Sequence, residues 1–219
     1  MNKQQYSTRY LALCAMFTAI GYVMVLVGKL IPNVAGFLSY EPKDTIIVIA
    51  GFIFGPMTCV IISVLTALIE MLTISHSGIY GFLMNALASC AFSVPAAWYY
   101  GRNRSQKGAV LGLAMGVVCM TVLMLLWNYI VTPFYMGVER SVVAGMLAGV
   151  FLPFNLIKGS LNAAITLLIY KPIVTALRRA GLVEERTGNK SRGGLGVTMA
   201  AGVVLVTLAL LFLVMSGVL

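Results

Sequence analysis

Charged residues are scarce in this sequence, and long apolar runs take their place. Of its 219 residues, only 10% are charged and 60% are hydrophobic, whereas a soluble domain has about 25% charged residues. Several apolar runs exceed about 18 residues, a length that needs a lipid phase to cover it. No segment alternates polar and apolar residues over about 10 positions, as a membrane strand does. These features predict an all-α membrane protein, whose helices satisfy their backbone groups within the bilayer.

The sequence also lacks the motifs of common enzymatic chemistry. It has no Gly-x-x-x-x-Gly-Lys-Ser/Thr phosphate loop, no His-Glu-x-x-His zinc helix and no Gly-x-Ser-x-Gly elbow. The four cysteines, Cys14, Cys59, Cys90 and Cys119, lie singly in apolar runs, which is typical of small buried hydrophobes. The single histidine, His76, lies between serines in an expected turn and receives no role. We therefore predict a protein that is not an enzyme, does not hydrolyse ATP, and has no metal or cofactor.

Positive charge is unevenly distributed along the chain. The net charge is +9, and most lysines and arginines lie in one set of alternate loops between apolar runs. By the positive-inside rule this set faces the cytoplasm, together with the N-terminus. The opposite loops contain the acids Glu41, Asp44 and Glu139. Because no basic stripe with interleaved aromatic residues occurs, nucleic-acid binding is excluded. We expect a multi-pass protein of the cell membrane.

Hydropathy and helix-breaking residues predict seven helical spans. In chain order they cover residues 8–31, 45–55, 57–74, 79–100, 108–132, 150–171 and 195–218. The second is too short to cross about 30 Å of hydrocarbon at about 1.5 Å per residue, and Gly55-Pro56 ends it. We predict a six-helix membrane domain over residues 1–180, a cytoplasmic linker over 181–194, and an appended transmembrane helix over 195–219.

Polar side chains at membrane depth are costly, so their distribution is informative. In the predicted orientation, five of them lie about 6 to 12 Å below the outer surface. They are Glu70, Asn85, Asn128, Asn155 and Lys158. One outward-opening polar pocket would explain this clustering.

The relation between Lys158 and its neighbours has more than one interpretation. Asn155, Lys158 and Asn162 are spaced three and four positions apart, so they share one stripe of their helix. That stripe either faces a ligand or forms helix–helix contacts, and Lys158 lies too deep to reach the interface easily. Glu70 is either the counter-ion of Lys158 or the partner in a structural hydrogen bond.

Small residues form a second pattern, on the first span. Ala12, Ala15 and Ala19 follow i, i+3, i+7 spacing, which makes a flat strip that another helix can approach closely. Packing inside the protein and docking of a partner are both compatible with this spacing.

Several of these features resemble the substrate-binding S components of energy-coupling factor (ECF) vitamin transporters. They are six closely connected helices, the short second helix ending in Phe-Ile-Phe-Gly-Pro at 52–56, and the alanine strip. The resemblance covers residues 8 to about 180. Trp-Asn-Tyr at 127–129 and Pro-Phe-Asn-Leu-Ile-Lys-Gly at 153–159 are similar to the riboflavin-specific members.

That resemblance implies a site for riboflavin. The family's pattern has a ligand-covering first loop and flavin-binding side chains in the outer half of the bundle. The expected substrate-binding residues are Tyr40, Glu41, Asn85, Asn128, Asn155 and Lys158. Asparagine amides both donate and accept, which suits the alternating edge of a flavin ring. The family has six helices, so the seventh span departs from its pattern.

The resemblance also implies partners, and two other classes remain as alternatives. The alanine strip would pack on a membrane coupling protein, which joins two cytoplasmic ATPases that drive import. An autonomous ion-coupled transporter needs several buried ionisable groups, and only Glu70 and Lys158 qualify. A membrane-embedded enzyme needs a nucleophile–base pair or a metal cluster, which the sequence lacks. Riboflavin and its phosphorylated form FMN both stay open, because Lys29, Lys43 and Arg140 are expected near the outer mouth.

Overall fold

The structure is a bundle of helices. The computed structural model describes residues 8–36, 38–75, 77–182 and 194–217. Its helices are α1 (Thr8–Lys29), α2 (Lys43–Phe54), α3 (Pro56–Thr73), α4 (Gly78–Arg102), α5 (Gln106–Met136), α6 (Arg140–Met146), α7 (Leu152–Arg179) and α8 (Gly194–Met215). No strand occurs in these ranges, and five helical segments in them are long and apolar enough to cross a membrane by length and composition. The all-α prediction is confirmed.

The connection between the fifth and sixth predicted spans differs from the expectation. The predicted spans 108–132 and 150–171 left residues 133–149 as a loop, but α5 continues through Pro133 to Met136 and is capped by Gly137, whose φ is 65°. Helix α6 and the π-helical turn η2 (Leu147–Phe151) then lead directly into α7. Membrane helices tolerate an internal proline because neighbouring groups satisfy the freed carbonyl.

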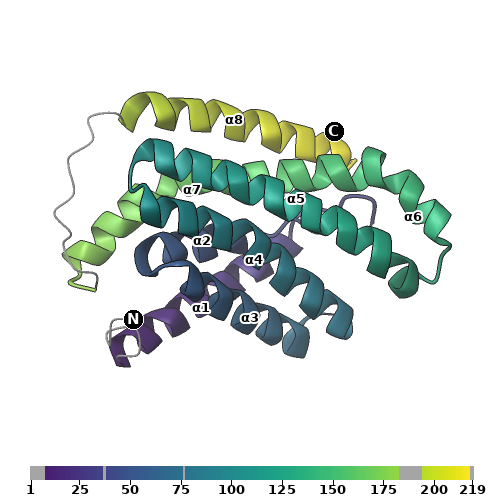
Figure 1. Ribbon diagram of the computed structural model, residues 1–219, viewed down its shortest axis with the longest axis horizontal. Coiled ribbons are helices and arrows are strands. Elements are labelled where there is room, and N and C mark those ends of the chain that lie inside the picture. The colour runs from purple at the N-terminus through teal and green to yellow at the C-terminus, as the bar shows by residue number, and fades with distance from the viewer. Residues whose placement is uncertain (1–7, 37, 76, 183–193, 218–219) are drawn as a thin grey trace.

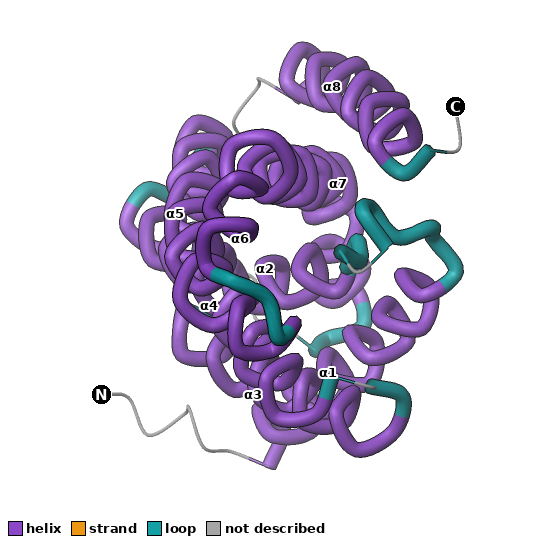
Figure 2. Tube along the Cα trace, turned by 90° about the vertical axis from the view of Figure 1, so that its right-hand side faces the viewer, coloured by secondary structure: helices purple, strands orange, loops and turns teal. Residues whose placement is uncertain are grey.

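Helix α2 lies at the centre of the bundle (Figure 2). Its residues from Lys43 to Phe52 are all buried, and it packs against α1, α3, α4 and α7. The sequence Ile-Ile-Val-Ile-Ala-Gly-Phe over 46–52 is apolar on every side, as a fully enclosed helix requires. The short second span was therefore predicted correctly as a helix, and its burial explains why it need not cross the bilayer.

Helices α4 and α5 approach each other closely at two glycines spaced four residues apart, Gly112 and Gly116. A Cβ placed on Gly112 would lie 2.8 Å from the carbonyl oxygen of Ala96, and one on Gly116 would collide with the carbonyl of Phe92. Small residues at this spacing let two backbones meet, which is a usual way of joining helices in lipid. The close packing of this pair positions α5, the helix that carries the buried Asn128.

Helix α8 runs alongside α7 on the outside of the bundle (Figure 1). Its bounds, Gly194–Met215, agree with the seventh predicted span. Most of the linker expected over 181–194 lies outside the described residues, so the division of the chain into membrane domain, linker and appended helix stays a prediction.

Candidate ligand-binding site

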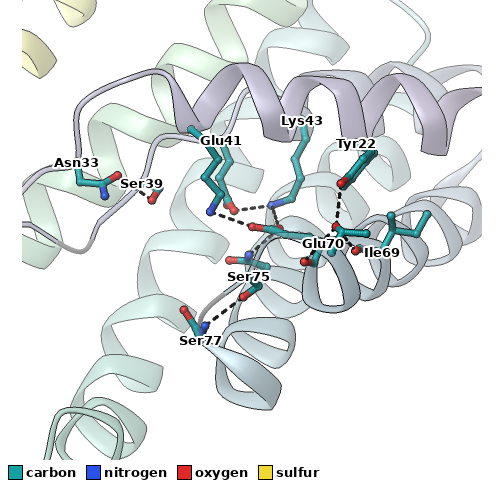
Figure 3. Close-up of polar contacts among 12 residues, drawn as sticks. Tyr22, Asn33, Ser39, Glu41, Lys43, Ile69, Glu70, Ser75 and Ser77 are labelled. Carbon is teal, nitrogen blue, oxygen red and sulfur yellow. Dashed lines mark hydrogen bonds and ion pairs between the residues drawn. The ribbon is translucent and has the colours of Figure 1, made fainter.

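A chain of ion pairs links α7 to α3 through Glu41 and Lys43. One carboxylate oxygen of Glu41 lies 2.6 Å from Nζ of Lys158 on α7, and the other lies 2.6 Å from Nζ of Lys43. Lys43 also approaches Glu70 on α3, at 3.7 Å (Figure 3). Lys43 has no exposed surface. The loop before α2 is thus tied by charge to both α3 and α7.

Glu70 makes a second set of contacts, near the C-terminal end of α3. Its carboxylate lies 3.1 Å from Nζ of Lys29 and accepts a 2.9 Å hydrogen bond from the amide of Asn85. The counter-ion of Lys158 is therefore Glu41. Of the two interpretations offered for Glu70, the structural hydrogen bond is the one present. Asn85 belongs to this outer contact and does not reach Lys158 directly.

Asn162 fastens the same loop to α7 by hydrogen bonds. Its amide donates to the carbonyl oxygen of Glu41 at 3.1 Å, and its side-chain oxygen accepts from the hydroxyl of Tyr40 at 2.9 Å. The hydroxyl of Thr45 donates to the same oxygen at 3.2 Å. Sequence reasoning placed Asn162 on the stripe of Lys158 but gave it no role in the site. The structure makes it the main neutral link between α7 and the Tyr40–Glu41 segment.

Asn128 and Asn155 are buried, but each hydrogen-bonds to the backbone four residues earlier in the chain. The amide of Asn128 donates to the carbonyl of Met124 at 2.7 Å, and its side-chain oxygen accepts from Thr132 at 2.8 Å. The amide of Asn155 donates to the carbonyl of Phe151 at 2.8 Å. The structure therefore does not join these two amides to the ion pairs. Turning either amide toward a ligand would exchange the hydrogen bond that it donates to the backbone.

The acids and bases of the network balance when one exposed lysine is counted. The acids Glu41, Asp44 and Glu70 and the bases Lys43 and Lys158 are buried, whereas Lys29, which pairs with Glu70, has a side chain that is 42% exposed. Three negative groups thus face three positive ones, which limits the large cost of burying charge. Asp44 also accepts a 2.5 Å hydrogen bond from the hydroxyl of Ser89. Burial alone would raise the pKa of Glu41, but the charges of Lys158 and Lys43 outweigh burial and hold that pKa below its usual range.

Two residues of this network were wrongly placed by sequence reasoning. Lys43 and Asp44 were assigned to an exposed outer loop, and Lys43 was expected near the outer mouth. Both are buried in the first turn of α2. An acid directly before an apolar run is a signal of a helix N-terminus, because it complements the helix dipole. That signal could have moved the start of the helix back to Lys43.

The predicted polar pocket has a different form in the structure. Its charged groups bind one another, and the amides of Asn128 and Asn155 donate to backbone carbonyls four residues earlier in the chain. A cavity of about 540 Å³ lies elsewhere, between α5, α7 and α8. Its lining is almost wholly apolar, with valine, alanine and leucine side chains and Ser160.

The alanine strip lies on the outside of α1. Ala12, Ala15 and Ala19 are all exposed, whereas Leu13 and Phe17 on the opposite face are buried. In the described part of the chain the strip is therefore not an internal packing surface. Docking of a partner on it stays a prediction.

The fold and the site define the class of protein. Helices long enough to cross a membrane enclose a cluster of buried ionic and amide side chains, which is typical of membrane proteins that bind a small solute. A comparison with family models gives the particular group: the model described as "ECF transporter, substrate-specific component" matches residues 9–170. The chain belongs to this family, and it is the S component of an ECF transporter.

Individual relatives agree with this assignment. The riboflavin transporter FmnP of Bacillus subtilis (strain 168) is 27% identical over 187 residues, covering 78% of this chain and 96% of FmnP. The riboflavin transporter RibU of Staphylococcus aureus (strain TCH60) is 27% identical over 186 residues, covering 82% and 96%. A solved structure described as "Structure and mechanism of the S component of a bacterial ECF transporter" has a TM-score of 0.66 at 28% identity, covering 77% and 97%. All three are transporter components rather than enzymes.

Proposed function

We propose that this chain binds riboflavin from the outer side of the cell membrane and releases it inward within an ECF transporter. The observation that carries this proposal is the 2.6 Å contact between Glu41 and Lys158. It brings the first loop onto the segment 153–159, the motif that resembles the riboflavin-specific members. The names of two relatives, both riboflavin transporters, support the same ligand.

Binding would exchange contacts within the protein for contacts with the flavin. The Tyr40–Glu41 segment would move away from Lys158, and the freed Nζ would donate to the ring's polar edge. The amides of Asn128 and Asn155 would turn from the backbone carbonyls to which they now donate toward the same edge of the ring, which presents both donors and acceptors. Because buried groups are satisfied before and after, the exchange avoids the cost of an unpaired polar atom.

The charge balance favours riboflavin over its phosphorylated form. Two bases expected at the outer mouth already have carboxylate partners: Lys29 pairs with Glu70, and Lys43 pairs with Glu41. The third, Arg140, lies with its guanidinium 5.5 Å from the ring centre of Tyr129. A phosphate would add negative charge to a group that is already neutral, at a high cost in a low dielectric.

Assembly with a coupling protein and two ATPases forms the second half of the proposal. The exposed strip Ala12, Ala15 and Ala19 offers a smooth face for a partner helix, as small residues do in lipid. In this arrangement the chain captures the ligand, and the ATPases supply the energy. The N-terminus lies in the cytoplasm, as the distribution of basic residues indicates.

Titration of riboflavin fluorescence against the full chain in detergent tests the proposal. We expect quenching that saturates at one flavin per chain, with FMN a weaker competitor. Fluorescence that is unaffected by a large excess of protein would contradict it. Uptake of riboflavin into vesicles that contain this chain but lack the ATPase subunits would instead indicate the alternative, an ion-coupled transporter.

A further inference from the structure

Helix α8 lies beyond the family match yet contacts the loop of the candidate site. The match ends at residue 170, whereas α8 covers Gly194–Met215. Phe212, near its C-terminal end, is 4% exposed. The ring of Phe212 lies 5.6 Å from the ring of Tyr40 and 6.4 Å from the ring of Phe154, between centroids. This addition to the family's fold therefore reaches the residue next to Glu41.

Tyr40 is held from two sides. Its hydroxyl donates to Asn162 on α7, and its ring packs on Phe212 of α8. Two more residues of the same loop, Val34 and Leu38, belong to the apolar cluster that contains Phe212. They also pair with each other through backbone hydrogen bonds of 2.9 and 3.0 Å. The loop is thus a compact unit with α8 as part of its support.

The contact is specific to one face of α8. Phe212 is buried, whereas its neighbour Leu211 is 48% exposed. Leu205, Leu208 and Ala209 are partly buried against the same cluster. A helix that served only as a membrane anchor would not need an aromatic side chain placed between Tyr40 and Phe154.

We propose that Phe212 is a positioning residue that holds the Tyr40–Glu41 segment over Lys158 and so slows the opening of the loop. The consequence for ligand exchange rests on the proposed function. Since Glu41 occupies Lys158 in this structure, a ligand can reach Lys158 only after the segment moves. Opening separates the ring of Tyr40 from Phe212, so α8 sets the rate of both entry and release.

Hydrogen exchange of the full chain in detergent tests the positioning role without any ligand. In Phe212→Ala we expect the amides of Val34 and Leu38 to exchange about tenfold faster, which corresponds to about 1.4 kcal/mol. Amides in the middle of α4 should be unchanged. Leu211→Ala, a truncation of the lipid-facing neighbour, should leave the loop at the wild-type rate. Phe212→Leu keeps an apolar side chain and folds more readily, so it should give a smaller increase in the same amides.

Stopped-flow measurement of riboflavin fluorescence tests the consequence for exchange. We expect Phe212→Ala to raise the association and dissociation rate constants together, each by about tenfold. In a Tyr40→Ala background the same substitution should add no further acceleration, because its effect passes through that ring. The inference would be overturned if the loop amides and the rate constants were unchanged in both Phe212 variants. It would also be overturned if the effects of Phe212→Ala added fully to those of Tyr40→Ala. Faster loop exchange in a protein that binds no riboflavin would support the positioning role and contradict only the proposed function.

Discussion

Nζ of Lys158 and a carboxylate oxygen of Glu41 lie 2.6 Å apart, although 117 positions separate the two residues in the sequence. This pair joins α7 to the loop before α2, and Lys43 extends it toward α3. The same contact stabilises the ligand-free fold and occupies the groups proposed to bind the ligand. Stability and binding should therefore respond together when either residue is changed.

Removing the charge of Glu41 should destabilise the bundle. Glu41→Gln removes the carboxylate that bridges Lys158 and Lys43, and it leaves Lys43 with the more distant Glu70 and the nearby charge of Asp44. Breaking a buried pair in this way costs about 3 to 5 kcal/mol, so thermal unfolding in detergent should occur at a clearly lower temperature. Glu139→Gln is the control, because Glu139 is exposed and contacts only a nearby serine. Equal unfolding temperatures for Glu41→Gln and the wild type would show that the ion pair is not formed.

Acid should weaken the fold through the same carboxylate. The pKa of Glu41 is held below its ordinary value of 4.5, despite burial, by Lys158 and Lys43. A group with a lowered folded-state pKa contributes its full stability above the unfolded-state value, and loses it as the pH falls further. The difference in unfolding temperature between wild type and Glu41→Gln should be constant from about pH 8 to about pH 6 and shrink below about pH 5. A difference that shrinks already above pH 6 would contradict this assignment.

The contact between α4 and α5 should not tolerate a methyl group. In Gly112→Ala, the new Cβ would lie 2.8 Å from the backbone oxygen of Ala96, which cannot rotate away. Overpacking of this kind costs about 1 to 3 kcal/mol, more than alanine gains over glycine in a helix. Gly101→Ala is the matched control, since nothing lies within 4 Å of a Cβ there, and it should be neutral or stabilising. Thermal unfolding of both variants tests this prediction. Equal unfolding temperatures for Gly112→Ala and Gly101→Ala would mean that α4 and α5 are farther apart than described.

A bulky residue on the alanine strip should prevent assembly without affecting riboflavin binding. Ala15→Trp places a large ring on the exposed face of α1, where a partner helix would have to approach closely. Co-purification with the coupling protein and ATPases should be lost, while the flavin titration stays at the wild-type affinity. Leu126→Trp, on the exposed side of α5, is the control and should still assemble. Normal co-purification of Ala15→Trp would place the interface elsewhere.

The sequence predicted the helices better than their contacts. Apolar length gave the spans now seen as α1 to α5, α7 and α8, and the cost of polar groups in lipid singled out Lys158, Asn155 and Glu70. The partner of Lys158 could not be read from spacing, because Glu41 reaches it only through the tertiary fold. The end predicted for the fifth span at residue 132 was wrong. Pro133 was expected to break the helix, but α5 continues through it to Met136.

Burial of the first turn of α2 also changes one argument made from the sequence. The ion-coupled alternative was disfavoured in the sequence analysis because only Glu70 and Lys158 were expected as buried ionisable groups. The structure adds Glu41, Lys43 and Asp44. Scarcity of buried charge therefore no longer excludes that alternative, and membership in the ECF family is what argues against it.

Riboflavin titration of the wild type, Lys158→Ala and Asn155→Ala tests the central claim most directly. The account predicts a saturable one-to-one complex for the wild type, and affinity weaker by about 1 to 3 kcal/mol in each variant, since a polar group of the ligand is left unpaired. Circular dichroism of each variant would establish that the helices are retained. Wild-type affinity in both variants would contradict the assignment of the ligand to this site.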